Sequence, residues 1–264
     1  MGEPLSIGII GGGGWLGRAI AEAIVDAQIV AAEHLTLSYR SGQPGFLPNA
    51  TWTRDNQELA DRSDVIIVSV RPQDWPAIDI SADGKLAMSV MAGVPLDQLA
   101  RRLNTERVVR TLPNAAAEVR NSYTPWIGSL GVTADDRNVA CRILEACGAA
   151  DEVESEADID YLTGLTGSGP AFPALLAAAM MDDAIRRGIS PDIARRSVSA
   201  VLIGTGKLLE ARSDNPKDIV RTFLDYRGTT AAAIEAMCAA GFEAAVADGL
   251  AAALQKSVSM GQAS

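Results

Sequence analysis

One stretch near the N-terminus constrains the fold most: an apolar strand, a glycine-rich turn and a helix follow one another directly. The strand is predicted over Ile7–Ile10 and the helix over Gly17–Ala27, with only glycines, Trp15 and Leu16 between them. Gly12, Gly14 and Gly17 fit the spacing G-x-G-x-x-G. In that pattern the first glycine permits a tight turn, the second lets a pyrophosphate approach the backbone, and the third packs the helix against the strand.

This segment predicts a dinucleotide-binding turn. The first N–H groups of a helix have no partner within the helix, so they are free to donate hydrogen bonds to phosphate oxygens. The alternative is a glycine-rich connection between a strand and a helix that binds no ligand.

The bulk composition argues against several classes of protein. The 264 residues carry a net charge of -10, and no basic face typical of nucleic-acid binding is visible. No apolar run reaches the roughly 20 residues that span a bilayer. We therefore expect no membrane partner. A strand begins almost at once, which leaves no room for a signal peptide.

Cysteine and histidine usage narrows the chemistry further. Cys141, Cys147 and Cys238 form no C-x-x-C pair, and an odd count predicts reduced thiols and a cytoplasmic location. The single histidine, His34, cannot build a histidine metal cluster or a Ser-His-Asp triad. We therefore expect no metal site.

The first part of the chain alternates between strands and helices, which predicts a doubly wound, mostly parallel sheet. The run 64–70 is apolar almost throughout, as expected of a strand buried on both faces. The predicted strands are Ile7–Ile10, Leu35–Tyr39, Asp64–Val70, Leu86–Met91, Val108–Thr111 and Ser122–Ile127, and the predicted helices are Gly17–Ala27, Leu96–Leu103 and Val139–Cys147.

After about Ser155 the pattern becomes helical and rich in alanine. The predicted helices are Ala174–Arg187, a long helix from Pro191 to about Ala211, one starting at Pro216, Thr230–Ala239 and Glu243–Lys256. We place a dinucleotide-binding domain at 1–155 and a helical substrate and dimerisation domain at 156–264. The apolar surface of these helices exceeds what one small domain can bury, which favours a homodimer.

The end of the second predicted strand bears on the choice of cofactor. An NAD site usually places an acidic residue there, which holds the ribose 2′-hydroxyl. This chain has Ser38 and Arg40 instead, a combination suited to a 2′-phosphate, so we predict NADPH in preference to NADH. The alternative is a solvated turn with an ordinary surface arginine.

Two further loops, Leu165–Pro170 and Tyr226–Thr230, contain glycine and hydroxyl side chains and precede predicted helices. Each such loop can bind an anion through backbone N–H groups, and together they suggest a substrate that bears a carboxylate. The alternative is two capped helices in which Ser168 and Thr229 or Thr230 are ordinary N-cap residues.

In order and spacing, six segments across nearly the whole chain resemble the pyrroline-5-carboxylate reductases. These are the glycine turn, Val70-Arg71-Pro72-Gln73, Ala92-Gly93-Val94, Arg110-Thr111-Leu112-Pro113-Asn114, Gly167-Ser168-Gly169-Pro170-Ala171 and Gly228-Thr229-Thr230. The resemblance implies a Rossmann domain, a helical dimerisation domain, and reduction of a cyclic imine acid to proline by NAD(P)H. It also implies dimers able to assemble into a larger ring.

The resemblance assigns roles to individual residues. Those expected at the pyrophosphate are Gly12, Gly14, Trp15 and Leu16, with Gly17 packing the helix of the same cofactor-binding turn. Ser38 and Arg40 are expected at the adenosine ribose. Further along the cofactor are Val70, Arg71, Pro72, Ala92 and Gly93, and near the nicotinamide are Pro113 and Asn114. Gly228, Thr229 and Thr230 are expected to hold the substrate carboxylate and ring nitrogen.

The chain departs from the family in the substrate loop. The usual Ser-Pro-Gly-Gly-Thr-Thr is here Asp225-Tyr226-Arg227-Gly228-Thr229-Thr230. Asp225 and Arg227 either pair with each other or contact polar groups of a ligand. We therefore expect the substrate to be 1-pyrroline-5-carboxylate or a close analogue of it. The family's methionine in the first turn is Trp15, and there is one extra glycine.

Two other functions remain open from the sequence. A β-hydroxyacid dehydrogenase shares this overall plan, but that family carries a lysine shortly after its Gly-x-Gly segment, and the stretch Pro170–Leu176 has none. A non-catalytic NADPH-binding regulator or sensor is the second alternative, because a fold does not determine a function.

Overall fold

The computed structural model describes residues 4–212 and 215–262. The chain divides into two compact units, and each is described by itself. Unit 1 comprises Met1–Ser168 together with Ala252–Ser264, and unit 2 comprises Gly169–Ala251.

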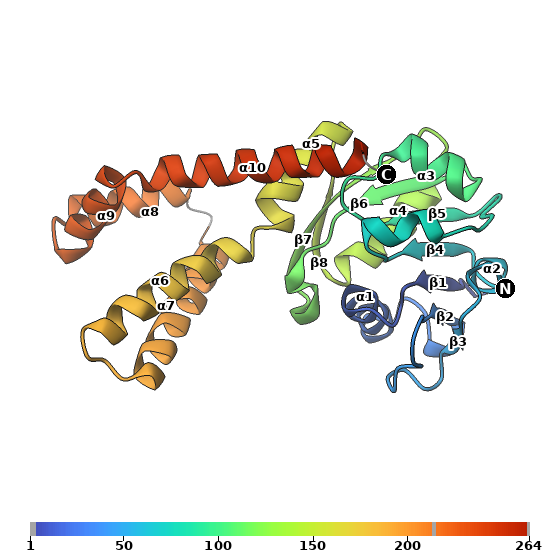
Figure 1. Ribbon diagram of the computed structural model, residues 1–264, viewed down its shortest axis with the longest axis horizontal. Coiled ribbons are helices and arrows are strands. Elements are labelled where there is room, and N and C mark those ends of the chain that lie inside the picture. The colour runs from blue at the N-terminus through green and yellow to red at the C-terminus, as the bar shows by residue number, and fades with distance from the viewer. Residues whose placement is uncertain (1–3, 213–214, 263–264) are drawn as a thin grey trace. The chain divides into compact units, whose positions relative to one another are not determined.

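Unit 1 is built on an eight-stranded sheet with the order β3-β2-β1-β4-β5-β6-β7-β8 (Figure 1). The strands are β1 (Ile7–Ile10), β2 (Leu35–Ser38), β3 (Thr51–Thr53), β4 (Val65–Val68), β5 (Leu86–Ser89), β6 (Val108–Thr111), β7 (Ser122–Gly128) and β8 (Gly148–Glu152). All neighbouring pairs are parallel except β6 and β7. The predicted doubly wound, mostly parallel sheet is therefore confirmed.

Helices cover both faces of this sheet. The elements are α1 (Trp15–Asp26), η1 (Ala32–His34), α2 (Asn56–Asp61), η2 (Pro72–Ala77), α3 (Leu96–Leu103), η3 (Ala115–Val119), α4 (Ala134–Glu145), α5 (Glu156–Leu162) and a π-helical turn over Thr163–Gly167. Successive β4 residues point to opposite faces: Ile67 packs in the cluster that contains α1 and α4, and Ile66 packs with α2 and α3. This alternation explains the continuous apolar run of β4.

A buried arginine ties the later part of unit 1 to the sheet. Arg110 on β6 is 2% exposed and donates to Glu156 at 2.8 Å and to Asp160 at 2.5 Å, both on α5. The Ser257 hydroxyl donates to the same Asp160 carboxylate at 3.3 Å. Removing one member of a buried ion pair leaves an uncompensated charge, so this network resists separation of α5 from the sheet.

Unit 2 contains α6 (Ala171–Arg186), α7 (Pro191–Ala211), α8 (Pro216–Asp225), α9 (Thr229–Ala239) and the first part of α10 (Phe242–Gln262). Among its described residues only three hydrophobic side chains are buried, namely Ala194, Val198 and Ala231. Large apolar side chains such as Leu175 and Ile203 are 73% and 60% exposed. These helices leave far more apolar surface in water than a self-contained domain does.

The helical region carries one membrane-length feature. Over the described residues no single helix is long and apolar enough to cross a membrane. Among these residues only the bent helix pair Thr229–Ala239 and Phe242–Met260 has the length and apolar composition of a membrane span.

Several short elements were not predicted, and one helix begins earlier than expected. They include the strands β3 and β8 and the helices α2 and α5. Helix α4 begins at Ala134 rather than Val139 because Thr133 and Asp136 form a capping box.

Candidate dinucleotide site and substrate loop

The glycine turn between β1 and α1 is held in a conformation that side chains would obstruct. Gly11 has φ +78°, and a Cβ there would overlap the Ser69 carbonyl oxygen. The residue that permits the tight turn is therefore Gly11, which corrects the assignment of that role to Gly12. A Cβ on Gly17 would overlap the Gly11 carbonyl oxygen and lie 2.9 Å from the Gly12 Cα. Gly17 thus brings α1 against the turn, as predicted.

The start of α1 presents free backbone donors. Gly14 is the N-cap and supplies no side chain, and its carbonyl accepts the Arg18 N–H at 2.9 Å. The N–H groups of Trp15, Leu16 and Gly17 have no acceptor in the described part of the chain. Three free donors at a helix N-terminus, beside backbone that bears no Cβ, fit a pyrophosphate.

Ser38, the last residue of β2, is 5% exposed and holds this turn in place. Its Oγ accepts the Gly11 N–H at 3.0 Å, and its carbonyl accepts the Gly13 N–H at 3.1 Å. The hydroxyl predicted at the adenosine ribose is therefore engaged with the glycine turn.

Two arginines meet at one carboxylate beyond the ends of β2 and β4. Asp74 of η2 accepts from Arg71 Nε at 2.9 Å and from Arg40 at 3.2 Å. The hydrogen bond from Arg71 is the largest influence on the pKa of Asp74. Burial opposes it, but the charges of Arg71 and Arg40 add to the hydrogen bond, so the pKa lies below its usual value. In the sheet β1 lies between β2 and β4, so this cluster stands at the topological switch point, where α/β sheets bind ligands. Sequence reasoning missed Asp74, because it is distant in sequence from Arg40.

Trp15, in the first turn of α1, is 51% exposed, and its indole N–H donates to the Glu118 carboxylate of η3. Glu118 belongs to a segment far along the chain, which the sequence pattern did not connect with the glycine turn. This contact fixes the indole beside the free donors of α1.

The remaining predicted cofactor residues follow successive strands. Val70 and Pro72 come after β4, and Ala92 and Gly93 come after β5. Asn114, after β6, is held by two hydrogen bonds within unit 1: Oδ1 accepts the Ala116 N–H at 2.9 Å and Nδ2 donates to the Thr166 carbonyl at 3.1 Å. In a parallel sheet the residues that follow neighbouring strands share one edge, so these residues line the same edge as the glycine turn.

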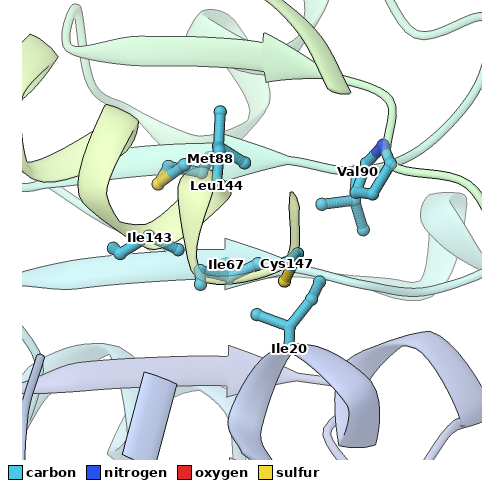
Figure 2. Close-up of a pocket in the computed structure, with 8 residues that line it drawn as sticks. Ile20, Ile67, Met88, Val90, Ile143, Leu144 and Cys147 are labelled. Carbon is cyan, nitrogen blue, oxygen red and sulfur yellow. The ribbon is translucent and has the colours of Figure 1, made fainter. Parts of the chain in front are cut away.

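Unit 1 also contains a small apolar void (Figure 2), and Pro113, which was predicted to border the cofactor, contributes to its lining. Its volume of about 10 Å³ has room for no more than about one water molecule. Its lining consists of Ile20, Ile67, Met88, Val90, Pro113, Ile143, Leu144 and Cys147. Burial raises the pKa of the Cys147 thiol to about 11, so this cysteine is uncharged at neutral pH. The void is a packing defect and is too small for a cofactor.

The substrate loop predicted in unit 2 lies between α8, which ends at Asp225, and α9, which begins at Thr229. Gly228 is the N-cap of α9 and supplies no side chain. The N–H groups of Thr229, Thr230 and Ala231 have no acceptor among the described residues. This arrangement again offers backbone donors to an anion.

Asp225 and Arg227 do not pair with each other, contrary to one of the two possibilities left open. Both are exposed, and neither has an ion pair within residues 4–212 and 215–262. Arg227 has φ +51°, a left-handed conformation, at the position where the resembled family carries a glycine. An arginine at this φ is strained by about 1 kcal/mol relative to glycine.

The segment predicted as the other anion-binding loop has a different structure. Residues Thr163–Gly167 continue from α5 as a π-helical turn, and Ser168 ends that turn. The Ser168 hydroxyl donates weakly to the Thr163 carbonyl at 3.4 Å. The alternative in which Ser168 caps the following helix is therefore wrong, because Pro170 is the N-cap of α6.

Comparison with known proteins extends these observations to the whole chain. A family model described as pyrroline-5-carboxylate reductase dimerisation matches residues 156–260. A second, described as NADP oxidoreductase coenzyme F420-dependent, matches residues 6–93.

The described residues contain no group of histidine, cysteine and acidic side chains arranged to hold a metal ion.

Relatives match over most of their length. A pyrroline-5-carboxylate reductase of Pseudomonas aeruginosa is 33% identical over 213 residues, 78% of each chain. One of Methanosarcina acetivorans is 30% identical over 273 residues, 98% of this chain and 99% of that protein. The crystal structure of Plasmodium falciparum pyrroline carboxylate reductase with NADP bound superimposes on this chain with a TM-score of 0.85 and therefore has the same fold. The match covers 98% of this chain and 99% of that one, at 24% sequence identity. This chain belongs to the pyrroline-5-carboxylate reductase family.

Proposed function

We propose that this protein reduces 1-pyrroline-5-carboxylate, or a close analogue, to L-proline with NADPH as the reductant. The observation that carries the proposal is the set of free N–H groups at Trp15, Leu16 and Gly17, held beside a side-chain-free turn. Family membership over nearly the full chain supports the same reaction.

The proposed cofactor site runs along one edge of the unit 1 sheet. The pyrophosphate lies on the turn from Gly12 to Gly17. The adenosine ribose lies beside Ser38 and Arg40, and the remainder of the cofactor follows Val70, Arg71, Pro72, Ala92, Gly93 and Asn114. The absence of an acidic residue at the end of β2 favours NADPH over NADH.

The proposed substrate site is the loop that begins α9. The free N–H groups at Thr229 and Thr230 hold the substrate carboxylate through the helix N-terminus. Gly228 leaves the backbone accessible to the ligand. Asp225 and Arg227, which have no ion-pair partner in the described chain, are available to polar groups of the substrate.

The reaction adds a hydride and a proton across the carbon–nitrogen double bond of the imine. NADPH supplies the hydride when it is bound. The chain binds and orients the carboxylate, and the Thr230 hydroxyl forms a hydrogen bond with the ring nitrogen. A protonated imine is already electrophilic and takes its proton from solvent before binding, so no histidine acid is required.

We further propose that residues 1–155 form the dinucleotide-binding domain and residues 156–264 the helical substrate and dimerisation domain. The exposed apolar side chains of unit 2 support a homodimer through these helices. The family resemblance supports further assembly of dimers into a ring. Three free cysteines support a cytoplasmic location.

The test is steady-state oxidation of NADPH with a panel of cyclic imine acids that includes 1-pyrroline-5-carboxylate, its six-membered homologue and a β-hydroxyacid control. Turnover of an imine acid supports the proposal. Cofactor binding without turnover of any imine acid would identify a regulator, and oxidation of the hydroxyacid would identify a dehydrogenase.

A further inference from the structure

The contacts of Asp74 bear on cofactor choice beyond the presence of Arg40. Its two carboxylate oxygens accept from two different guanidinium groups, Arg71 at 2.9 Å and Arg40 at 3.2 Å. The side chains of Arg40 and Arg71 are 77% and 63% exposed, whereas Asp74 is 29% exposed. The arginines can therefore reach a ligand in solvent, while Asp74 lies more deeply against the protein.

A carboxylate and a phosphate compete for the same donors. Both accept charge-assisted hydrogen bonds from a guanidinium fork, and both carry negative charge. A 2′-phosphate that approaches Arg40 must displace Asp74 from that guanidinium or share it. It must also accept repulsion from the carboxylate close by, which solvent and salt only partly screen.

The unphosphorylated cofactor meets a different environment. NADH presents a neutral ribose 2′-hydroxyl, and a carboxylate is the group that usually accepts from it in NAD sites. In this chain the end of β2 carries no acid, and the fold brings one from η2 to the same guanidinium.

We propose that Asp74 is a specificity-determining residue that occupies Arg40 and thereby limits the preference of this enzyme for a 2′-phosphorylated cofactor. The inference rests on the proposed cofactor site at the edge of the sheet. Arg71 acts with it as a positioning residue, because its hydrogen bond keeps the carboxylate beside Arg40.

The experiment measures equilibrium binding to the full chain by isothermal titration calorimetry. The variant Asp74→Asn is compared with wild type for NADPH and NADH. Adenosine 2′,5′-bisphosphate and AMP are included as probes that differ in the 2′-phosphate and lack the nicotinamide. We expect Asp74→Asn to bind NADPH and the bisphosphate about three- to thirtyfold more tightly, as removal of a nearby like charge predicts. We expect the affinity of Asp74→Asn for NADH and AMP to be the same as that of the wild type or lower.

The matched control is Asp183→Asn. The carboxylate of Asp183 on α6 also pairs with two arginines, Arg186 at 3.2 Å and Arg187 at 2.7 Å. Asp183→Asn changes the net charge of the protein by the same amount as Asp74→Asn. We expect no change in cofactor binding. When Arg40 is already replaced by Ala, we expect Asp74→Asn to change the Kd for the bisphosphate by no more than about twofold. The reason is that Asp74 is proposed to act on the phosphate through Arg40.

Asp74→Ser repeats the test if the asparagine variant is poorly folded. Unchanged or weaker NADPH binding by either folded variant would overturn the role of Asp74 and leave the proposed function intact. A wild-type chain that binds neither cofactor would overturn the proposed function itself, and this inference with it.

Discussion

The Arg107 guanidinium donates from Nε to Asp136 Oδ2 at 2.9 Å and joins the start of β6 to the first turn of α4. A second nitrogen of Arg107 donates to the other oxygen, so the pair is bidentate. The Asp136 side chain is 5% exposed and also accepts the Thr133 N–H at 3.0 Å. One carboxylate therefore serves both a tertiary ion pair and a helix cap.

This pair predicts a specific loss of stability in acid. Burial by itself would raise the pKa of Asp136, but hydrogen bonds from Arg107 and Thr133 together outweigh burial and hold the pKa below its usual value. A depressed pKa in the folded state contributes stability that is complete above the unfolded pKa of about 3.9 and is lost as pH falls through the folded value. Asp136→Asn should cost about 1–3 kcal/mol at pH 7, and much less near pH 3.

Urea unfolding at pH 7, 5, 4 and 3 measures this difference. Asp97→Asn is the control, because its pair with Arg101 is exposed and should be worth less than about 1 kcal/mol at any pH. A constant difference between wild type and Asp136→Asn across this range would contradict the prediction.

Gly17→Ala should impair both folding and cofactor binding. The added methyl overlaps the Gly11 carbonyl and must push α1 away from the turn, at a cost of about 1–3 kcal/mol. Thermal unfolding and the Kd for NADPH report the two effects. Gly45→Ala is the control, because a Cβ there meets nothing within 4 Å. Wild-type affinity in Gly17→Ala would show that the close approach of α1 is not needed.

Arg40→Ala should remove most of the discrimination between NADPH and NADH. A charge-assisted hydrogen bond to the 2′-phosphate is worth about 1.5–3 kcal/mol, roughly tenfold to a hundredfold in the ratio of Kd values. The measurement is the Kd for each cofactor in wild type and variant. An unchanged ratio of the two Kd values in Arg40→Ala would show that Arg40 does not recognise the phosphate.

The loop before α9 should make this enzyme less suited to 1-pyrroline-5-carboxylate than a relative with glycine and serine there. Replacing Asp225 by Ser and Arg227 by Gly together removes two charges and the left-handed arginine. We expect kcat/KM on 1-pyrroline-5-carboxylate to rise roughly tenfold, and the wild type to prefer an imine acid with an added polar group. Arg221→Gly, an exposed change on α8, is the control.

The opposite outcome would have a clear meaning. If the wild type reaches a kcat/KM of about 10⁴ M⁻¹s⁻¹ or more on 1-pyrroline-5-carboxylate, within the usual range of enzymes, and the double change lowers it, the loop is not specialised.

The full chain should be at least a dimer at micromolar concentration. Side chains such as Leu175 and Ile203 are mostly exposed in the single chain, and burial of apolar area is the main driving force of association. Sedimentation velocity over a range of concentrations tests this. A stable, active monomer would end the proposal of an obligate dimer.

Local sequence was sufficient wherever neighbouring residues control the structure. The strand Ile7–Ile10, the glycines and α1 follow from apolar patterning and from the backbone freedom of glycine, which act over a few residues. The doubly wound sheet followed for the same reason, because the apolar run of β4 and the alternation of strands with helices such as α1 and α3 are visible in the sequence. The short edge strand β3 and the acidic strand β8 lack such a pattern. They are strands because their backbones pair with β2 and β7, and a contact of that kind is not visible in the local sequence.

The candidate site depended on contacts that no local pattern encodes. Asp74 lies beside Arg40 only because β2 and β4 flank β1 in the sheet. Ser38 reaches the Gly11 N–H for the same reason, and the left-handed residue of the turn proved to be Gly11 rather than Gly12. Sequence determined which residues could bind a dinucleotide, whereas the order of strands decided which of them meet, because pairing between distant segments is set by burial of the whole sheet.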